Sequence, residues 1–376
     1  MGCNGSYTMK SKYTSLKDSS RKTDDEHLPV FFRLAVVGDR EKFDDLLASG
    51  GILLCDEIYS QLKELVKSRN PSKVLTDAEY ADLISKQLGG VGIDAYGVWV
   101  YYPWAHKVVH LLDKDEFIEL RTSRNKYKIT VEEQAILSRK IIGIIGLSVG
   151  QSIALTIAME RVCGSLRLAD FDTLDLSNLN RLRAGVHNIG LKKTVIAARE
   201  IAELDPYFNV EIYSDGVTAD NIDSFFTANG KLDILIEVCD GLDMKILSRY
   251  KAKELHIPVV MDTNDKGMVD VERFDLEPER AVLHGLADGL NPGNMGSITG
   301  EQRLPIILKM VGGDNLSARM KRSMGEIGKT ISTWPQLASS VVLGGAITTD
   351  ICRRIFLDQF RASGRYYIDF EELVAD

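Results

Sequence analysis

Residues 141–172 read IIGIIGLSVGQSIALTIAMERVCGSLRLADFD, and this stretch decides the fold. An apolar strand over 141–145 precedes a glycine-containing turn at 146–150. A helical segment over 153–162 then leads to a second strand, 166–169, which ends at Asp170. Strand, tight turn, helix and a strand with an acidic tip are typical of a mononucleotide-binding βαβ unit. The stretch therefore predicts a nucleotide site at the turn.

The same alternation continues toward the C-terminus. The pattern predicts strands at 210–213, 234–238 and 258–261, helices at 194–204, 219–228 and 242–255, and C-terminal helices at 303–311 and 336–361. Strands this rich in Val, Ile and Leu indicate a parallel sheet that helices cover on both faces. We therefore expect an α/β fold with a Rossmann-like, mostly parallel sheet over residues 136–376. A Gly- and Asn-rich loop is expected over 285–300.

The part of the chain before this sheet is expected to have two sections. Residues 1–28 are polar and predict a disordered tail, and residues 29–135 predict a small α/β accessory domain. That domain carries no catalytic motif, so we interpret it as a support or docking domain. Its expected helices lie near 41–47, 56–67 and 77–88, and its expected strands lie at 97–102 and 107–112. Near its end, Thr130 followed by Glu133 predicts a helix start with a capping box.

Composition excludes several classes of function. With 46 basic and 54 acidic residues the formal net charge is −8, which disfavours bulk binding to nucleic acid or to an anionic membrane. The five cysteines are scattered without a CxxC pair, so neither a disulfide framework nor a zinc site is expected. The longest apolar run, 337–347, is too short to span a membrane. These features predict a cytoplasmic protein.

Four motifs follow the turn in a fixed order: LADFDT (168–173), SNLNR (177–181), GLKK (190–193) and Cys239-Asp240. Together with the spacing of Gly146 and Asp170, they resemble the superfamily of ThiF, MoeB and the ubiquitin-activating enzymes, and in particular a bacterial ThiF-like subgroup. The resemblance covers about residues 121–275. It implies ATP-dependent adenylation of a carboxylate, such as the C-terminus of a ubiquitin-like or sulfur-carrier protein, with release of pyrophosphate. It also implies a homodimer.

The chemistry of adenylation assigns roles to these residues. A carboxylate and the α-phosphate repel each other, so cations must stabilise the transition state. Arg181 and Lys193 are the candidate cations, although Arg181 has the alternative of an ordinary ion pair, and Lys192 stands beside Lys193 as a competing amine. Asn178 is a candidate polar contact to phosphate or to a metal-bound water. Asp170, at the strand tip, is placed to accept hydrogen bonds from ribose hydroxyls.

Magnesium and the glycine turn complete the expected ATP site. Mg²⁺ needs a carboxylate at the end of a strand, for which Asp240 is the candidate ligand and Asp172 the assistant. The alternative role of Asp240 is to cap the next helix. At the turn, Gly146, Ser148 and Gly150 are expected to contact the nucleotide. The superfamily pattern there is Gly-x-Gly-Gly-x-Gly, but this chain has Ser148, Val149 and Gln151 at positions 148, 149 and 151. Either the turn takes a modified path that uses Gly150, or nucleotide binding is weakened.

One further residue and two other functions are considered. In relatives an arginine before the first strand reaches the ATP of the partner subunit, and Arg124 matches that position, with Arg121 as a competitor. No cysteine lies between Asp240 and Cys352, so a covalent thioester is not expected. The alternatives to adenylation are a non-catalytic nucleotide-binding scaffold of the same fold and an NAD-dependent oxidoreductase.

Overall fold

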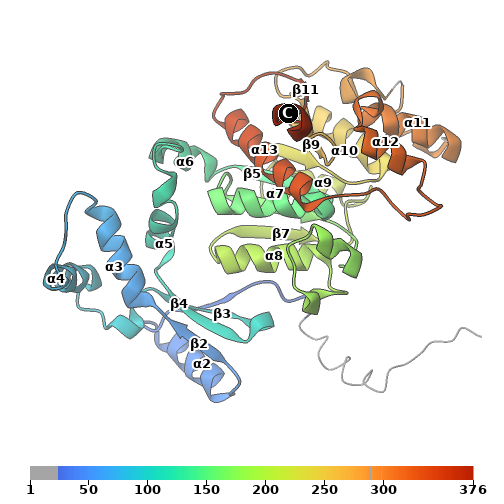
Figure 1. Cartoon of the computed structure of the whole chain (residues 1–376). Helices are drawn as coiled ribbons and strands as arrows, with labels where there is room; N and C mark the ends of the chain where they lie inside the picture. Colours follow the sequence, from blue (N-terminus) through green and yellow to red (C-terminus); the bar gives the residue numbers. More distant parts are fainter. Residues whose placement is uncertain (1–23, 288, 298, 376) are drawn as a thin grey trace, which may run out of the picture. The chain divides into compact units, whose positions relative to one another are not determined.

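The computed structural model describes residues 24–287, 289–297 and 299–375 (Figure 1). Most of the predicted tail, residues 1–23, lies outside the described part. The described chain forms two compact units. The first comprises the residues up to Val66 together with Val74–Asp113, and the second comprises Lys67–Lys73 together with the chain from Lys114 onward.

The first unit contains a four-stranded sheet with the strand order β1-β3-β4-β2, in which only β2 and β4 pair in parallel. Its strands are β1 (Val30–Phe32), β2 (Leu53–Asp56), β3 (Val98–Tyr102) and β4 (Lys107–Leu111). The helices in this part of the chain are α2 (Val37–Ala48), α3 (Ile58–Arg69) and α4 (Asp77–Leu88). The sequence predicted the three helices, β3 and β4, but missed the short strands β1 and β2.

A histidine belongs to the core of the first unit. His110 is fully buried, and its ring stacks on Trp99 with a centroid separation of 4.0 Å. Its Nδ1 lies 2.9 Å from Asp56 Oδ1, and its Nε2 lies 2.7 Å from the carbonyl oxygen of Tyr96. Because both ring nitrogens are used within the fold, His110 has a structural role.

The second unit contains a seven-stranded sheet with the order β11-β10-β9-β8-β5-β6-β7. The five strands β5 to β9 run parallel, and β10 and β11 add an antiparallel edge. The expected Rossmann-like, mostly parallel sheet is thus confirmed. The strands are β5 (Ile141–Ile145), β6 (Ser165–Ala169), β7 (Asn209–Tyr213), β8 (Ile234–Glu237), β9 (Val259–Thr263), β10 (Met268–Glu272) and β11 (Gly364–Tyr366).

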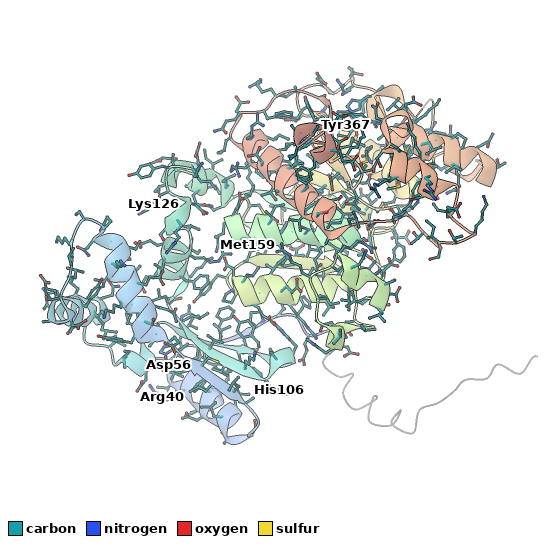
Figure 2. All side chains as sticks on the ribbon, viewed as in Figure 1. Arg40, Asp56, His106, Lys126, Met159 and Tyr367 are labelled. Atoms are coloured by element: carbon teal, nitrogen blue, oxygen red, sulfur yellow. The ribbon has the colours of Figure 1, made fainter. Side chains whose placement is uncertain are left out.

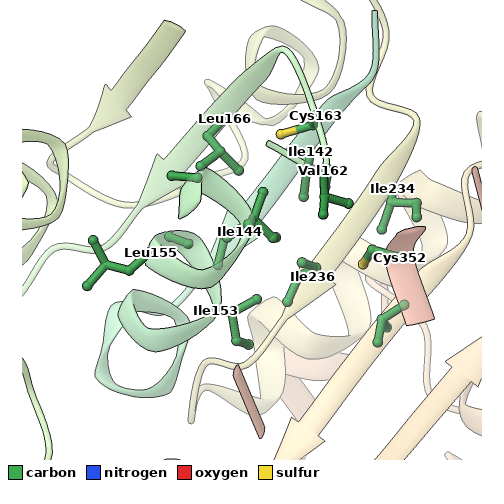
Figure 3. Packing of buried hydrophobic residues seen from close by; sticks show 14 of the residues in the cluster. Ile142, Ile144, Ile153, Leu155, Val162, Cys163, Leu166, Ile234, Ile236 and Cys352 are labelled. Carbon is green, nitrogen blue, oxygen red and sulfur yellow. The ribbon is translucent and has the colours of Figure 1, made fainter. Parts of the chain in front are cut away.

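Helices cover both faces of this sheet. Successive residues of a strand, such as Ile144 and Ile145, belong to different apolar clusters, because successive side chains of a strand point to opposite faces. Helices α7, α8 and α13 pack on the cluster shown in Figure 3, and α9 and α10 pack on the other. The helices are α5 (Lys114–Arg121), α6 (Val131–Leu137), α7 (Leu147–Glu160), α8 (Lys193–Leu204), α9 (Ile222–Thr227), α10 (Leu242–Glu254), α11 (Gly300–Met310), α12 (Ala318–Met324), α13 (Ala338–Phe356) and α14 (Phe370–Leu373).

Local signals in the sequence had mixed success in the second unit. The capping box before α6 is confirmed, since Thr130 Oγ1 accepts a hydrogen bond from the Glu133 amide at 3.2 Å. The predicted turn over 146–150 is wrong: β5 ends at Ile145, and α7 begins at Leu147, six residues earlier than expected. Among the described residues, none of the helices has the length and apolar character needed to cross a membrane.

Candidate functional site

The carboxyl ends of the parallel strands form the candidate site. Because β5, β6, β8 and β9 run in the same direction, the residues that follow them gather at one edge of the sheet. This edge collects Gly146 after β5, Asp170 after β6, and Asp240 after β8. Ligands of open α/β sheets bind at this edge.

Gly146 and Gly150 are each required by the fold, for different reasons. Gly146 adopts φ 93°, and a Cβ atom there would lie 2.8 Å from the backbone of Cys239. Only glycine allows the chain to pass directly from β5 into α7 at this point. Gly150 lies inside α7, where a Cβ would come within 2.8 Å of Ile144 Cγ2. Gly150 therefore allows the helix to pack against the strand, and the predicted modified turn that uses Gly150 is not formed.

Asp170 fixes the start of α7. Its Oδ2 accepts a hydrogen bond from the Leu147 amide at 2.7 Å, and its Oδ1 accepts one from the Asp172 amide at 2.8 Å. Burial raises the pKa of Asp170, while the positive charge of Lys193 and these two amides oppose the rise. Each oxygen keeps a second lone pair. The predicted contact to a ribose hydroxyl stays a prediction.

Arg181 lies over the N-terminus of α7. Its Nε and Nη2 donate to Ser148 Oγ at 3.1 and 2.9 Å, and its Nη1 donates to Asn180 Oδ1 at 2.9 Å. Burial lowers the pKa of Arg181, and the nearby carboxylate of Asp240 opposes that change. The structure thus joins Ser148 and Arg181 at one point, where the positive end of a helix dipole meets a guanidinium.

Gln151 holds the segment that carries Arg181. Its side chain is 3% exposed, and its amide group binds both main-chain groups of Arg183. Nε2 donates to the Arg183 carbonyl and Oε1 accepts from the Arg183 amide, each at 3.0 Å. Sequence reasoning missed this role. The signal was the departure from glycine at position 151, because a side chain in place of a glycine can form contacts that glycine cannot.

Asn178 and Lys193 are both committed to partners within the fold. Asn178 Oδ1 accepts a hydrogen bond from the Asp175 amide at 3.0 Å, as part of a capping box at the start of the SNLNR segment. Lys193 is 7% exposed, and its Nζ lies 2.7 Å from Asp172 Oδ2. Lys192 instead donates to the carbonyls of Phe171 and Ser214. Of the two lysines, Lys193 is the one paired with a carboxylate.

Asp240 lines a cavity of about 160 Å³ at the carboxyl ends of β8 and β9. Its side chain is exposed, and α10 begins after Gly241 without a side-chain cap, so the capping alternative for Asp240 is not realised. Cys239 lines the same cavity, where burial raises the pKa of its thiol and keeps it protonated. Within the described ranges, no cluster of three or more His, Cys, Asp or Glu side chains is arranged to hold a metal ion.

Arg124 lies away from these residues. Its neighbours Arg121 and Asn125 bind carbonyl groups at the C-terminal end of α7, namely those of Ala158, Met159 and Glu160. Figure 2 labels Lys126 in this segment and Met159 near the end of the helix. Helix α7 has 14 residues, so its two ends are about 20 Å apart. Arg124 is exposed at the far end and cannot reach the candidate site of its own chain.

Comparisons with known proteins identify the family of the chain. The model of the ThiF family matches residues 122–312, just over half of the chain. An uncharacterized protein of Mycobacterium tuberculosis is 39% identical over 332 residues, which are 86% of this chain and 46% of that protein. This chain therefore spans less than half the length of that relative. The tRNA threonylcarbamoyladenosine dehydratase of Bacillus subtilis is 23% identical over 62% of this chain and 95% of its own length.

Two further similarities concern an adenylyltransferase and a solved structure. A probable molybdopterin-synthase adenylyltransferase of Porphyra purpurea is 26% identical over 199 residues, 48% of this chain and 51% of that protein. Among solved structures, the E. coli tRNA N6-threonylcarbamoyladenosine dehydratase in complex with ATP covers 66% of this chain and 98% of its own. The TM-score is 0.46 and the sequence identity is 16%.

Proposed function

This chain belongs to the ThiF family, and on that basis we propose that it uses ATP to adenylate a carboxylate. The observation that carries the proposal is Arg181, held on Ser148 at the N-terminus of α7. The first amides of a helix have no partner within the helix, and the helix dipole adds positive charge there. A guanidinium beside that end concentrates positive charge, which a phosphate group would neutralise.

The surrounding residues support the rest of an adenylation site. Asp170 holds the start of α7 in place and has lone pairs left for the ribose. In the proposed reaction a carboxylate oxygen attacks the α-phosphate, the bond to pyrophosphate breaks, and Arg181 and Lys193 offset the growing negative charge. Mg²⁺, when bound by Asp240 with Asp172 assisting, would supply further charge neutralisation. The exposed carboxylate of Asp240 suits this role, since Mg²⁺ commonly takes one or two protein carboxylates beside phosphate oxygens.

The acceptor that we propose is the C-terminal carboxylate of a ubiquitin-like or sulfur-carrier protein. The similarity to an adenylyltransferase of molybdopterin synthase supports this class, and so does the similarity to ubiquitin-like modifier-activating enzyme 5 of Caenorhabditis elegans, 23% identical over 33% of this chain. The raised pKa of the Cys239 thiol supports release of the acyl-adenylate without a thioester at that residue.

A homodimer is proposed from the position of Arg124. Arg124 is exposed at the far end of α7, out of reach of the site of its own chain, so a role in adenylation would place it at the site of another subunit. Arg124→Ala is expected to abolish turnover. Mixing that variant with an Arg181→Ala variant would restore part of the activity, because half of the sites in a mixed dimer would be intact. Failure of the mixture to regain activity, with dimers present by light scattering, would contradict this assignment.

ATP–pyrophosphate exchange tests the proposed function. The purified chain, with Mg²⁺ and a panel of ubiquitin-like proteins, peptides and small acids, should show exchange with at least one acceptor. Asp240→Asn should lose it, while Asp243→Asn should keep it, because Asp243 forms only an exposed ion pair with Arg303. No exchange with any acceptor, although ATP binds in calorimetry, would favour the nucleotide-binding scaffold. Tight binding of NAD(H) instead of ATP would favour the oxidoreductase.

A further inference from the structure

A set of buried oxygen atoms without hydrogen-bond partners lies at the end of β9. Asp262 is 5% exposed, and neither of its carboxylate oxygens has a partner among the described residues. The same holds, in that part of the chain, for Thr263 Oγ1 and Asn264 Oδ1. All three residues line the cavity beside Asp240. Three consecutive residues with unpaired oxygens are unusual, because buried polar groups in native proteins nearly always have partners.

The fold makes room for the Asp262 carboxylate. A Cβ atom on Gly344 of α13 would lie 2.1 Å from Asp262 Oδ2, so any side chain at that position would displace the carboxylate. Burial alone raises the pKa of Asp262 to about 7, with no nearby cation to oppose it. An isolated buried carboxylate destabilises a fold. A buried carboxylate without partners among the described residues, in the wall of a cavity, indicates a ligand-binding role.

Negatively charged side chains outnumber positively charged ones in the wall of this cavity. Asp240, Asp262 and Asp265 line it, against the single ammonium group of Lys245. That ammonium is already bound to both carboxylate oxygens of Glu237, each at 3.1 Å. Asp265 is satisfied by the amide and the hydroxyl of Ser317, both at 2.7 Å. Among the three carboxylates of the wall, the buried one without a donor in the described part of the chain is therefore Asp262.

The rest of the wall is apolar and suits an aliphatic chain. It is formed mainly by Val149, Val238, Ile307, Val311, Leu316, Met320 and Trp334. The parallel register pairs Ile236 with Val260. Asp262 lies within β9, which ends at Thr263, whereas Asp240 follows the end of β8 at Glu237. A ligand in the cavity can therefore contact the buried carboxylate and the apolar wall together.

We propose that this cavity binds an alkylammonium group of the substrate, with Asp262 neutralising the charge and Asn264 Oδ1 accepting a second hydrogen bond. This inference rests on the proposed function in one respect. The bound amine anchors an acid, and the carboxylate of that acid then reaches ATP at the N-terminus of α7. The substrate class is therefore a carboxylic acid that carries a primary amine, which in a protein acceptor would be a lysine side chain near the C-terminal carboxylate. Recognition itself does not depend on the adenylation step.

Calorimetry with n-butylamine and n-butanol tests the recognition directly at pH 8. The full chain should bind the amine at least tenfold more tightly than the alcohol. Asp262→Asn should lose that preference, and Asp243→Asn, an acid-to-amide change outside the cavity, should keep it. Equal affinity of the wild type for the two probes, or a preference that survives in Asp262→Asn, would overturn the proposal. The proposal would also be overturned if the binding of Mg²⁺, and not the binding of butylamine, depended on Asp262.

A measurement on the wild-type protein tests the proposal even if the Asp262→Asn variant misfolds. A ligand that binds the folded chain and not the unfolded chain raises the thermal unfolding midpoint. At pH 8 butylamine should raise the midpoint of the wild type while butanol should not, and equal stabilisation by both would count against the proposal. In the exchange assay, 6-aminohexanoate should outperform hexanoate. Absence of all exchange with amine binding intact would remove the proposed function and leave the amine site standing.

Discussion

The two halves of the carboxyl edge of this sheet differ in how their polar groups are satisfied. On the β5–β6 side, both oxygens of Asp170 accept main-chain hydrogen bonds, Gln151 uses both ends of its amide, and Arg181 is held by Ser148. On the β9 side, the oxygens of Asp262 have no partner among the described residues. The first half is organised before any ligand arrives, whereas the second lacks the donors that a ligand would bring.

This difference does not come from burial, because the two aspartates are both buried. Asp170 is 9% exposed and Asp262 is 5% exposed, and burial raises the pKa of both. What separates them is the presence of two amides and a lysine around Asp170. A buried acid with partners stabilises the local fold, and a buried acid without partners destabilises it. The same substitution in the two places should therefore have opposite effects.

Replacing Asp262 by asparagine gives the largest expected change in stability. A raised folded-state pKa means that the folded chain binds the proton more tightly than the unfolded chain, so charging the group opposes folding. The cost grows as pH rises from about 4 to about 7 and stays constant above. It corresponds to about 4 kcal/mol at pH 8, from a pKa near 7 against an ordinary value of 3.8. Asp262→Asn should raise the urea midpoint at pH 8 and raise it only about a quarter as much near pH 4.5.

Asp170→Asn is the matched control on the other side of the edge. The amide nitrogen would face the N–H group of either Leu147 or Asp172, leaving donors opposed to each other. We expect a loss of about 1–3 kcal/mol at pH 8. If both variants shifted the midpoint in the same direction, or if the Asp262→Asn difference did not change with pH, the contrast between the two halves would be wrong.

Among changes on the β5–β6 side of the edge, Arg181→Ala should have the largest effect on activity. Removing the guanidinium from the N-terminus of α7 takes away charge stabilisation in the transition state, for which a loss of about 100-fold or more in exchange rate is expected. Arg183→Ala is the control, because Arg183 is held through its main chain by Gln151 and its side chain is not needed for that contact. Equal rates for the two variants would remove Arg181 from the site.

Gly344→Ala tests the other half through the space that Asp262 occupies. The added methyl group would lie within 2.1 Å of Asp262 Oδ2, so the carboxylate or the helix must move, at about 1–3 kcal/mol. Gly38→Ala in α2 has open space around the new Cβ and should be neutral or slightly stabilising. Thermal unfolding of the two variants and the wild type provides the comparison. A neutral Gly344→Ala would show that the carboxylate can rearrange freely.

Sequence patterns predicted the β5–β6 half better than the β9 half. Apolar runs identified β5, β6 and α8, and the acidic strand tip located Asp170. The start of α7 was missed because its cap comes from Asp170, 23 residues away, and not from a local side chain. A hydrogen bond between residues so far apart in the sequence does not change the local pattern of apolar residues.

The antiparallel strand β10 shows the same limit more strongly. Asp270 and Glu272 within it are almost fully buried, because Arg365 and Arg249 neutralise them from distant parts of the chain and His284 Nε2 lies 2.9 Å from Asp270 Oδ1. Charged residues in a short segment favour a loop when they are considered alone. Asp262 was missed for the opposite reason, since its importance comes from the partners it lacks, which only the folded chain reveals.

Gln151→Gly, on the β5–β6 side of the edge, has the smallest expected effect, a loss of affinity for ATP. The change restores the glycine of the superfamily pattern and removes both hydrogen bonds to Arg183, while α7 and Asp170 are left in place. Arg181 would keep its contacts to Ser148 but would sit on a looser segment. We therefore expect ATP to bind about 3- to 10-fold more weakly, equivalent to about 1 kcal/mol.

Gln134→Ala is the control for this change. Gln134 also donates from a part-buried side chain to a carbonyl, that of Arg161, but at the opposite end of α7. Its loss should lower stability without changing the affinity for ATP. If Gln151→Gly bound ATP as tightly as the wild type, Gln151 would not organise the site. The ordered character of the β5–β6 half would then depend on Asp170 and Ser148 alone, because they hold the helix start and the guanidinium directly.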